Sequence, residues 1–153
     1  MNGELIVTDK SSLLGSFEHI QKSIEEVKTP EEAGELRHRV EAFGKYVRKK
    51  LPSIIKDRHE RYKIAEEMAW KYLLAVHKHG KLWNDIPDEK KRPDGQPKNR
   101  SNLNGTIGWD DVGFANRRDA LVSGRIGSLD IQDLMIYREA QQGRERLVSP
   151  NGA

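Results

Sequence analysis

The residues best suited to do chemistry lie near the C-terminal end, in the run ANRRDA at positions 115–120. The guanidinium groups of Arg117 and Arg118 can donate paired hydrogen bonds to guanine or to phosphate, and the amide of Asn116 suits adenine. Arg125 follows about two helical turns later and adds another cation. This pattern predicts that the four side chains contact nucleic acid from one short helix.

A second basic cluster lies in the run KKRPDGQPKNR, which has five cations and one acid. Its cations are Lys90, Lys91, Arg92, Lys98 and Arg100. The surrounding segment, residues 84–105, contains three Pro, two Gly and four Asn and has no apolar periodicity, so it is predicted to be a linker or an exposed loop. We expect these cations to share phosphate contacts with the arginines of ANRRDA.

Charge is distributed unevenly along the 153 residues, although the net charge is only +3. Residues 1–36 carry a net charge of −5 and residues 37–63 a net charge of +7. This change of sign indicates either a basic surface for a phosphate backbone or an acidic partner, or two helix faces that attract each other within the fold. Residues 106–146 hold six Arg and seven acids, and Asp110, Asp111 and Asp119 would repel phosphate unless they face away.

Three amphipathic helices are expected before the basic loop, at about residues 12–28, 30–51 and 54–79. Apolar residues recur in steps of three and four along each, which is the spacing of helices that pack side by side. Thr29 is a suitable N-cap and Pro30 a suitable first helical residue. Pro52 is expected to break the second helix, and Gly80 to end the third.

Cap residues then recur at short intervals and predict helices at about 107–112, 117–123 and 129–142. Two short helices joined by a turn with glycine, followed by a third, are typical of a helix-turn-helix module. The predicted fold is all-α, with a bundle or hairpin of three helices and a small C-terminal trihelical, helix-turn-helix-like module. The expected divisions are an association region at 1–83, the loop at 84–105, the module at 106–146 and a tail at 147–153.

Other chemistry is not predicted. The chain has no cysteine, which excludes disulfides, thiolate metal sites and a cysteine nucleophile. His77 and His79 are two positions apart, so they do not share a helix face, and the aspartates of the module are explained by helix capping. We expect no enzyme activity, no metal and no cofactor. No apolar run is long enough for a membrane helix and no signal peptide is evident, so a cytoplasmic protein is expected.

Residues 35–135 resemble a group of uncharacterised bacteriophage and mobile-element proteins. The resemblance rests on ELRHRVEAFGKYVRKK, RHERYKIAEEMAWKYLLAVHKHG and GWDDVGFANRRDALVSGRI. The matching positions are Ala65, Glu66 and Ala69 in the long helix and Val112, Gly113 and Phe114 at the turn. The resemblance implies a phage or plasmid context and a DNA-associated or regulatory role, and it carries no known chemistry. The run ANRRDA departs from the family, whose members are richer there in Ser, Gln and Lys.

Two functions remain open from the sequence. The first is a non-enzymatic, homodimeric DNA-binding or regulatory protein of a phage or mobile element. The alternative is a protein-interaction module that binds and blocks a host protein without touching nucleic acid. Its contact surface would be the acidic N-terminal part of the chain, formed by Glu18, Glu25, Glu26, Glu31, Glu32 and Glu35.

Overall fold

The computed structural model describes residues 9–92 and 106–153. Across these residues the chain forms five α-helices: α1 (Lys10–Glu26), α2 (Pro30–Ile54), α3 (Arg58–Asn84), α4 (Arg117–Gly127) and α5 (Ile131–Gly143). Two short 3-10 helices, η1 (Asp88–Lys90) and η3 (Trp109–Val112), lie between α3 and α4, and one isolated β-bridge joins Lys91 to Ile107. The prediction of an all-α fold is confirmed. No helix in the described ranges is both long enough and apolar enough to cross a membrane.

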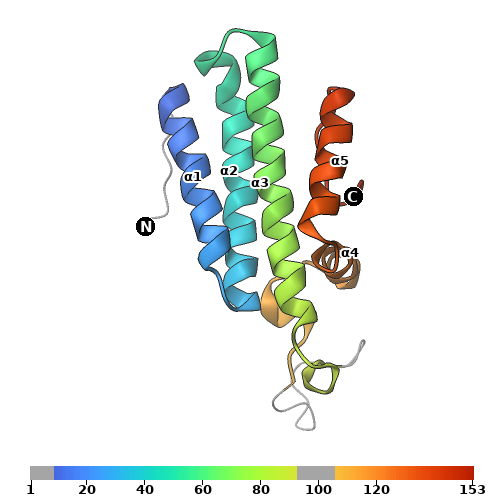
Figure 1. The fold of residues 1–153 in the computed structure, drawn as a ribbon. Coiled ribbons are helices and arrows are strands. Elements are labelled where there is room, and N and C mark those ends of the chain that lie inside the picture. Colours follow the sequence, from blue (N-terminus) through green and yellow to red (C-terminus); the bar gives the residue numbers. More distant parts are fainter. Residues whose placement is uncertain (1–8, 93–105) are drawn as a thin grey trace.

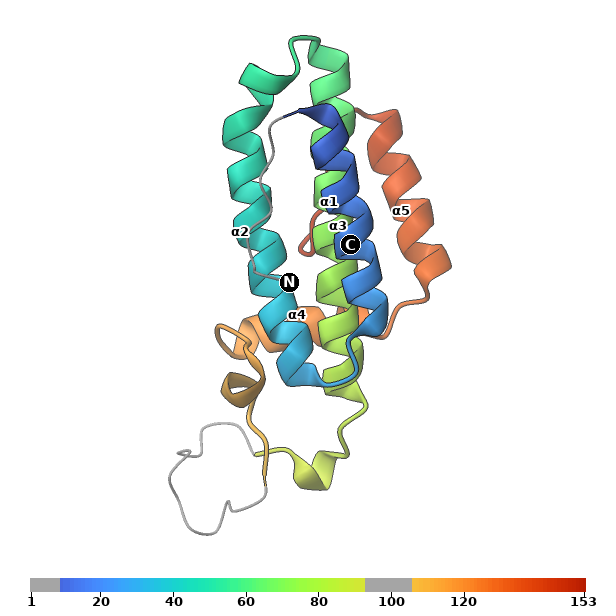
Figure 2. The same ribbon diagram turned by 90° about the vertical axis from the view of Figure 1, so that its left-hand side faces the viewer.

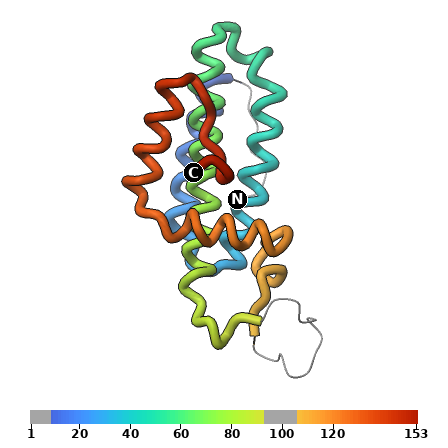
Figure 3. The backbone as a smooth tube through the Cα atoms, turned by 90° about the vertical axis from the view of Figure 1, so that its right-hand side faces the viewer, coloured from blue at the N-terminus to red at the C-terminus, as the bar shows by residue number. Residues whose placement is uncertain are grey.

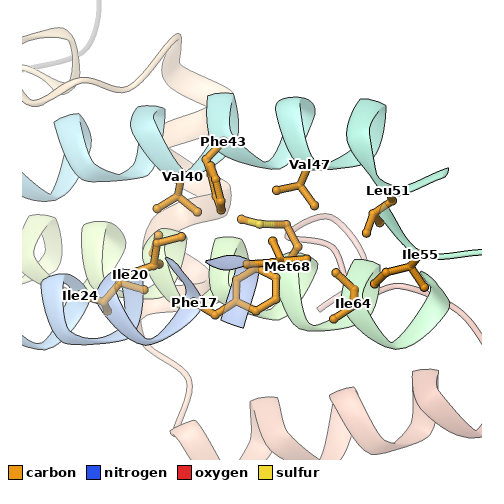
Figure 4. Packing of buried hydrophobic residues seen from close by; sticks show 12 residues of the cluster. Phe17, Ile20, Ile24, Val40, Phe43, Val47, Leu51, Ile55, Ile64 and Met68 are labelled. Carbon is orange, nitrogen blue, oxygen red and sulfur yellow. The ribbon is translucent and has the colours of Figure 1, made fainter. Parts of the chain in front are cut away.

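Helices α1, α2 and α3 run side by side with alternating direction (Figures 1 and 2). Their apolar stripes meet in one core, in which Phe17 of α1 and Phe43 of α2 lie near Met68 of α3 (Figure 4). Burial of this stripe removes apolar side chains from water, which is the main favourable contribution to folding. The stripes recognised in the sequence therefore pack against one another within a single chain.

The ends of α2 and α3 differ in part from the sequence prediction. Thr29 caps α2 by accepting a hydrogen bond from the amide of Glu32 at 3.2 Å, as expected. The predicted break at Pro52 is wrong, because α2 continues to Ile54. Pro52 lies in the last turn and removes only one amide donor, while the amide of Ile55 still bonds to the carbonyl of Leu51 at 2.8 Å.

The predicted end of α3 at Gly80 is also wrong, since the helix continues to Asn84. Gly80 is required for packing instead, because its backbone lies against that of α4, which runs across the bundle (Figure 3). A Cβ atom at Gly80 would overlap the backbone of Ser123 in α4, and one at Gly127 would overlap the backbone of Lys81. Two glycines on opposite helices thus permit a close backbone approach.

The C-terminal elements also begin and end at other residues than expected. Asn116 caps α4 through the amide of Asp119, as predicted, but α4 extends past Gly124 to Gly127. The last helix, α5, is capped by Asp130 rather than by Ser128, with the amide of Gln132 donating at 2.9 Å.

Helix α5 lies beside α3, and the chain then turns back along the bundle (Figure 3). Its one buried residue, Leu134, packs with Trp70 and Leu73 of α3 in a second core cluster. Arg138 adds ion pairs of 2.6 Å to both Glu66 and Glu67. Helix α3 is therefore the central element, against which the other four helices pack.

Candidate functional site

A buried polar network joins α2, α3 and α4 where α4 crosses the bundle. The guanidinium of Arg37 donates to Asp119 Oδ1 at 2.7 Å and to Ser123 Oγ at 3.0 Å, both on α4. It also donates to the hydroxyl of Tyr72 on α3 at 3.4 Å. The side chain of Arg37 is 9% exposed and that of Asp119 is 18% exposed, so this ion pair is largely shielded from water.

Asp119 is held in its ionised form by this network. Burial alone would raise its pKa, but the amide of Ala115, which donates at 2.9 Å, and the guanidinium of Arg37 together outweigh burial. The pKa of Asp119 therefore lies below its ordinary value. Because Ala115 precedes the cap of α4, this hydrogen bond to Asp119 also fixes the residues before α4 to the first turn of the helix.

His79 extends the network from α3 to the turn before α4. Its Nε2 donates to the carbonyl of Val112 at 2.6 Å, so Nδ1 carries the lone pair and lies 3.5 Å from Nη1 of Arg37, which donates to it. The ring stacks on Phe114 with centroids 3.9 Å apart. Complete burial lowers the pKa of His79 to about 4, so the imidazole is neutral at pH 7.

A second ion-pair group neutralises the acids of η3. Arg92 donates to Asp110 Oδ1 at 3.1 Å and to Asp111 Oδ2 at 2.7 Å, and its own side chain is only 8% exposed. The three carboxylates that would repel phosphate, Asp110, Asp111 and Asp119, thus each have an arginine partner supplied from outside residues 106–146.

The outward face of α4 carries the cations. Arg117, Arg118, Leu121 and Arg125 are all exposed, and Leu121 is 60% exposed. Positions 117, 121 and 125 are four residues apart, so they follow one side of the helix. The structure therefore brings together the arginines predicted from ANRRDA and Arg125, while Asn116 at the start of α4 acts as its cap.

The described part of the predicted basic loop contributes less surface charge than its composition suggests. Lys90 is exposed, but Lys91 lies 4.6 Å above the ring of Trp83 and 3.8 Å from Asp88. Arg92 is committed to the acids of η3, as described above. Lys98 and Arg100 lie outside the described residues.

Sequence reasoning missed Arg37 and His79. In the sequence Arg37 is one of the cations of the basic stretch 37–63, and His79 enters only as one of two histidines that do not form a metal site. A signal for Arg37 existed, because it occupies a core position in the stripe of Ala33, Val40 and Gly44. An arginine in such a stripe requires a buried acid, and the sequence alone does not say which one.

Histidines and acids do not gather into a metal site in the described part of the chain. His77 donates through Nε2 to the carbonyl of Leu129 at 2.9 Å, which ties α3 to the turn between α4 and α5. Comparison of the chain with protein-family models, with curated proteins and with solved structures gave no match.

Proposed function

We propose that the exposed face of α4 binds the phosphate backbone and major groove of duplex DNA. The observation that supports this best is the pairing of Asp110, Asp111 and Asp119 with Arg92 and Arg37, together with the exposure of the arginines of α4. A phosphate approaching α4 meets Arg117, Arg118 and Arg125, while Asp110, Asp111 and Asp119 are already neutralised.

The size of α4 suits this role. Its 11 residues span roughly 16 Å at about 1.5 Å per residue, and a helix of ordinary diameter enters a major groove of about 12 Å. In this proposal α4 acts as the second helix of a helix-turn-helix-like unit, with η3 and the turn at Gly113 in place of the first. The packing of Gly80 and the Arg37–Asp119 pair hold α4 against the bundle. The proposed DNA-contacting helix is therefore supported rigidly. The phage or mobile-element context and a regulatory role belong to the same proposal.

The test is the binding of a fluorescent random duplex by anisotropy across a salt series. A plot of log K against log salt has a slope of about −0.9 per phosphate contact, so replacing Arg117, Arg118 and Arg125 with Gln should make the slope shallower by about 3. Light scattering of the same samples measures whether the species that binds DNA is the homodimer expected from the sequence. Exposed substitutions of this kind change the free energy of unfolding by less than about 0.5 kcal/mol, so the fold is retained.

A matched control removes three cations from the other end of the bundle. Lys49, Lys56 and Arg58 are exposed and lie near the turn between α2 and α3, far from α4 (Figure 1). Their replacement with Gln should leave the salt slope nearly unchanged. Absence of binding at low salt, or equal losses in the two triple variants, would contradict the proposal.

Binding of a basic protein is the second candidate function, because the acidic residues of α1 and of the first turns of α2 are exposed. They are Glu18, Glu25, Glu26, Glu31, Glu32 and Glu35. A host protein that stays on the immobilised chain after nuclease treatment, and is released when these residues are changed to Gln, would support this function. Release of the host protein by the nuclease would instead favour contact through DNA.

A further inference from the structure

A cavity of about 280 Å³ lies between α2, α3 and the C-terminal segment at residues 147–150. It is close to the lower end of the range for small-molecule sites, which is about 300–1,000 Å³. Nothing in the DNA-binding proposal uses it. Its walls are mainly apolar, with Val40 and Val47 from α2, Met68 from α3 and Val148 from the C-terminal segment.

Small residues on two facing helices create the hollow. Gly44 on α2 lies opposite Ala65 and Ala69, which are one turn apart on α3, and all three line the cavity. A Cβ atom at Gly44 would lie 3.6 Å from Cγ of Met68, an ordinary contact distance, so this glycine leaves space that a methyl group could occupy. Larger side chains at these positions would close the gap between the helices.

The third wall is fixed in place. Val148 is buried, and the amide of Ser149 donates to the hydroxyl of Tyr137 at 3.2 Å. The hydroxyl of Tyr62 donates to the carbonyl of Arg146 at 3.2 Å. Leu147 borders the cavity yet is 44% exposed, so part of the wall is apolar surface that a ligand would cover.

The rim of the cavity carries a net positive charge. Glu41 and Lys45 form an exposed i,i+4 pair at 3.6 Å and offset each other. Arg48 donates through Nε to the carbonyl of Gly44 at 3.4 Å, and no carboxylate in the described part of the chain pairs with it. Its guanidinium therefore supplies the rim cation that is not offset by a neighbouring carboxylate of the described residues.

We propose that this cavity binds a small amphiphile with one carboxylate, its apolar chain between Gly44, Ala65 and Ala69 and its carboxylate on Arg48. An apolar interior with one cation at its mouth matches an acyl chain or single ring that ends in one anionic group. The limited volume restricts the ligand to a short chain. The site is separate from α4, so its occupation does not depend on DNA binding.

The experiment is a calorimetric titration of the full chain with butanoate, hexanoate and octanoate. Each added methylene should tighten binding about fourfold until the cavity is full, because burying a methylene is worth ~0.8 kcal/mol. Octan-1-ol has the same chain as octanoate without the charge. Because Arg48 is exposed, Arg48→Gln should weaken octanoate binding only about fivefold, and it should leave octan-1-ol binding unchanged.

Ala69→Leu fills the cavity and should abolish binding of both ligands. Ala42→Leu, on the exposed side of α2, adds the same side chain outside the cavity and should bind octanoate as the original chain does. Lack of saturable octanoate binding in the original chain would overturn the proposal, and so would an unchanged affinity in Ala69→Leu. Equal effects of Arg48→Gln on octanoate and octan-1-ol would overturn the assignment of the carboxylate.

Discussion

Replacing Arg37 with Met should destabilise the fold because it leaves Asp119 in a shielded position without its cation. The two side chains are 9% and 18% exposed, and their shortest contact is 2.7 Å. Removing one partner of a fully buried pair costs about 3–5 kcal/mol; the partial exposure of Asp119 and its bond from Ala115 favour the lower end, about 3 kcal/mol. Methionine retains most of the apolar stem of arginine, so the loss of unfolding free energy measures mainly the removal of the positive charge.

A double-mutant cycle isolates the pair. Asp119→Asn alone should cost about 2 kcal/mol, and the combination with Arg37→Met should cost about 3 kcal/mol rather than the sum, because neither charge is then left unpaired. The expected coupling energy is therefore about 2 kcal/mol. Urea denaturation followed by far-ultraviolet circular dichroism measures all four proteins at pH 7.

Arg39→Met provides the matched control. Arg39 follows Arg37 on α2 but forms an exposed pair with Glu35 at 3.7 Å, with side chains 58% and 72% exposed. Its replacement should cost less than about 0.5 kcal/mol. Additive single mutations, or equal losses for Arg37→Met and Arg39→Met, would refute the reasoning that this network fixes α4.

Two further predictions concern the contacts that hold α4 against α2 and α3. The folded-state pKa of His79, about 4, is below its ordinary value of 6.5, so its contribution is present above pH 6.5 and is lost as pH falls toward 4, by up to about 3 kcal/mol. His79→Gln should flatten this dependence in urea titrations at several pH values; an unchanged slope would contradict it. Gly80→Ala should cost roughly 1–3 kcal/mol or more because its Cβ meets the backbone of Ser123, whereas Gly15→Ala, in open space, should stabilise α1 by about 0.5–1 kcal/mol. Thermal unfolding compares the Gly80→Ala and Gly15→Ala variants. Equal effects would show that the backbone of α4 does not lie in close contact with Gly80.

Local signals in the sequence located the helices and several caps, since these depend on residues within one or two turns. Thr29 and Asn116 bond to amides three positions away, so their side chains identify helix starts directly. The helix ends predicted at Pro52 and Gly80 were wrong because the effect of each residue depends on its position in the fold. Pro52 lies in the last turn of α2, and Gly80 lies where α4 packs on α3. The residue type alone does not predict either position.

Pairings between distant positions could not be predicted. Arg37 and Asp119 are 82 positions apart, and Arg92 and Asp111 are 19 apart across the loop. Several acids in the chain could have neutralised Arg37 equally well by type. The choice depends on where α4 crosses α3, which the backbone contact of Gly80 and Ser123 decides.

The same pairings change how the charge of residues 106–146 should be counted. By composition this segment is slightly acidic, with seven acids and six arginines. Asp110, Asp111 and Asp119 are paired with cations from other segments, however, and a close ion pair acts on a distant phosphate as a dipole, whose field falls off faster than that of a single charge. Arg117, Arg118 and Arg125 are exposed, and a phosphate that contacts one of them lies well within the Debye length of about 8 Å. Although the segment has a negative formal charge, the outward face of α4 therefore offers phosphate a positive surface, because the partners that neutralise these three aspartates come from α2 and from Arg92 of the loop.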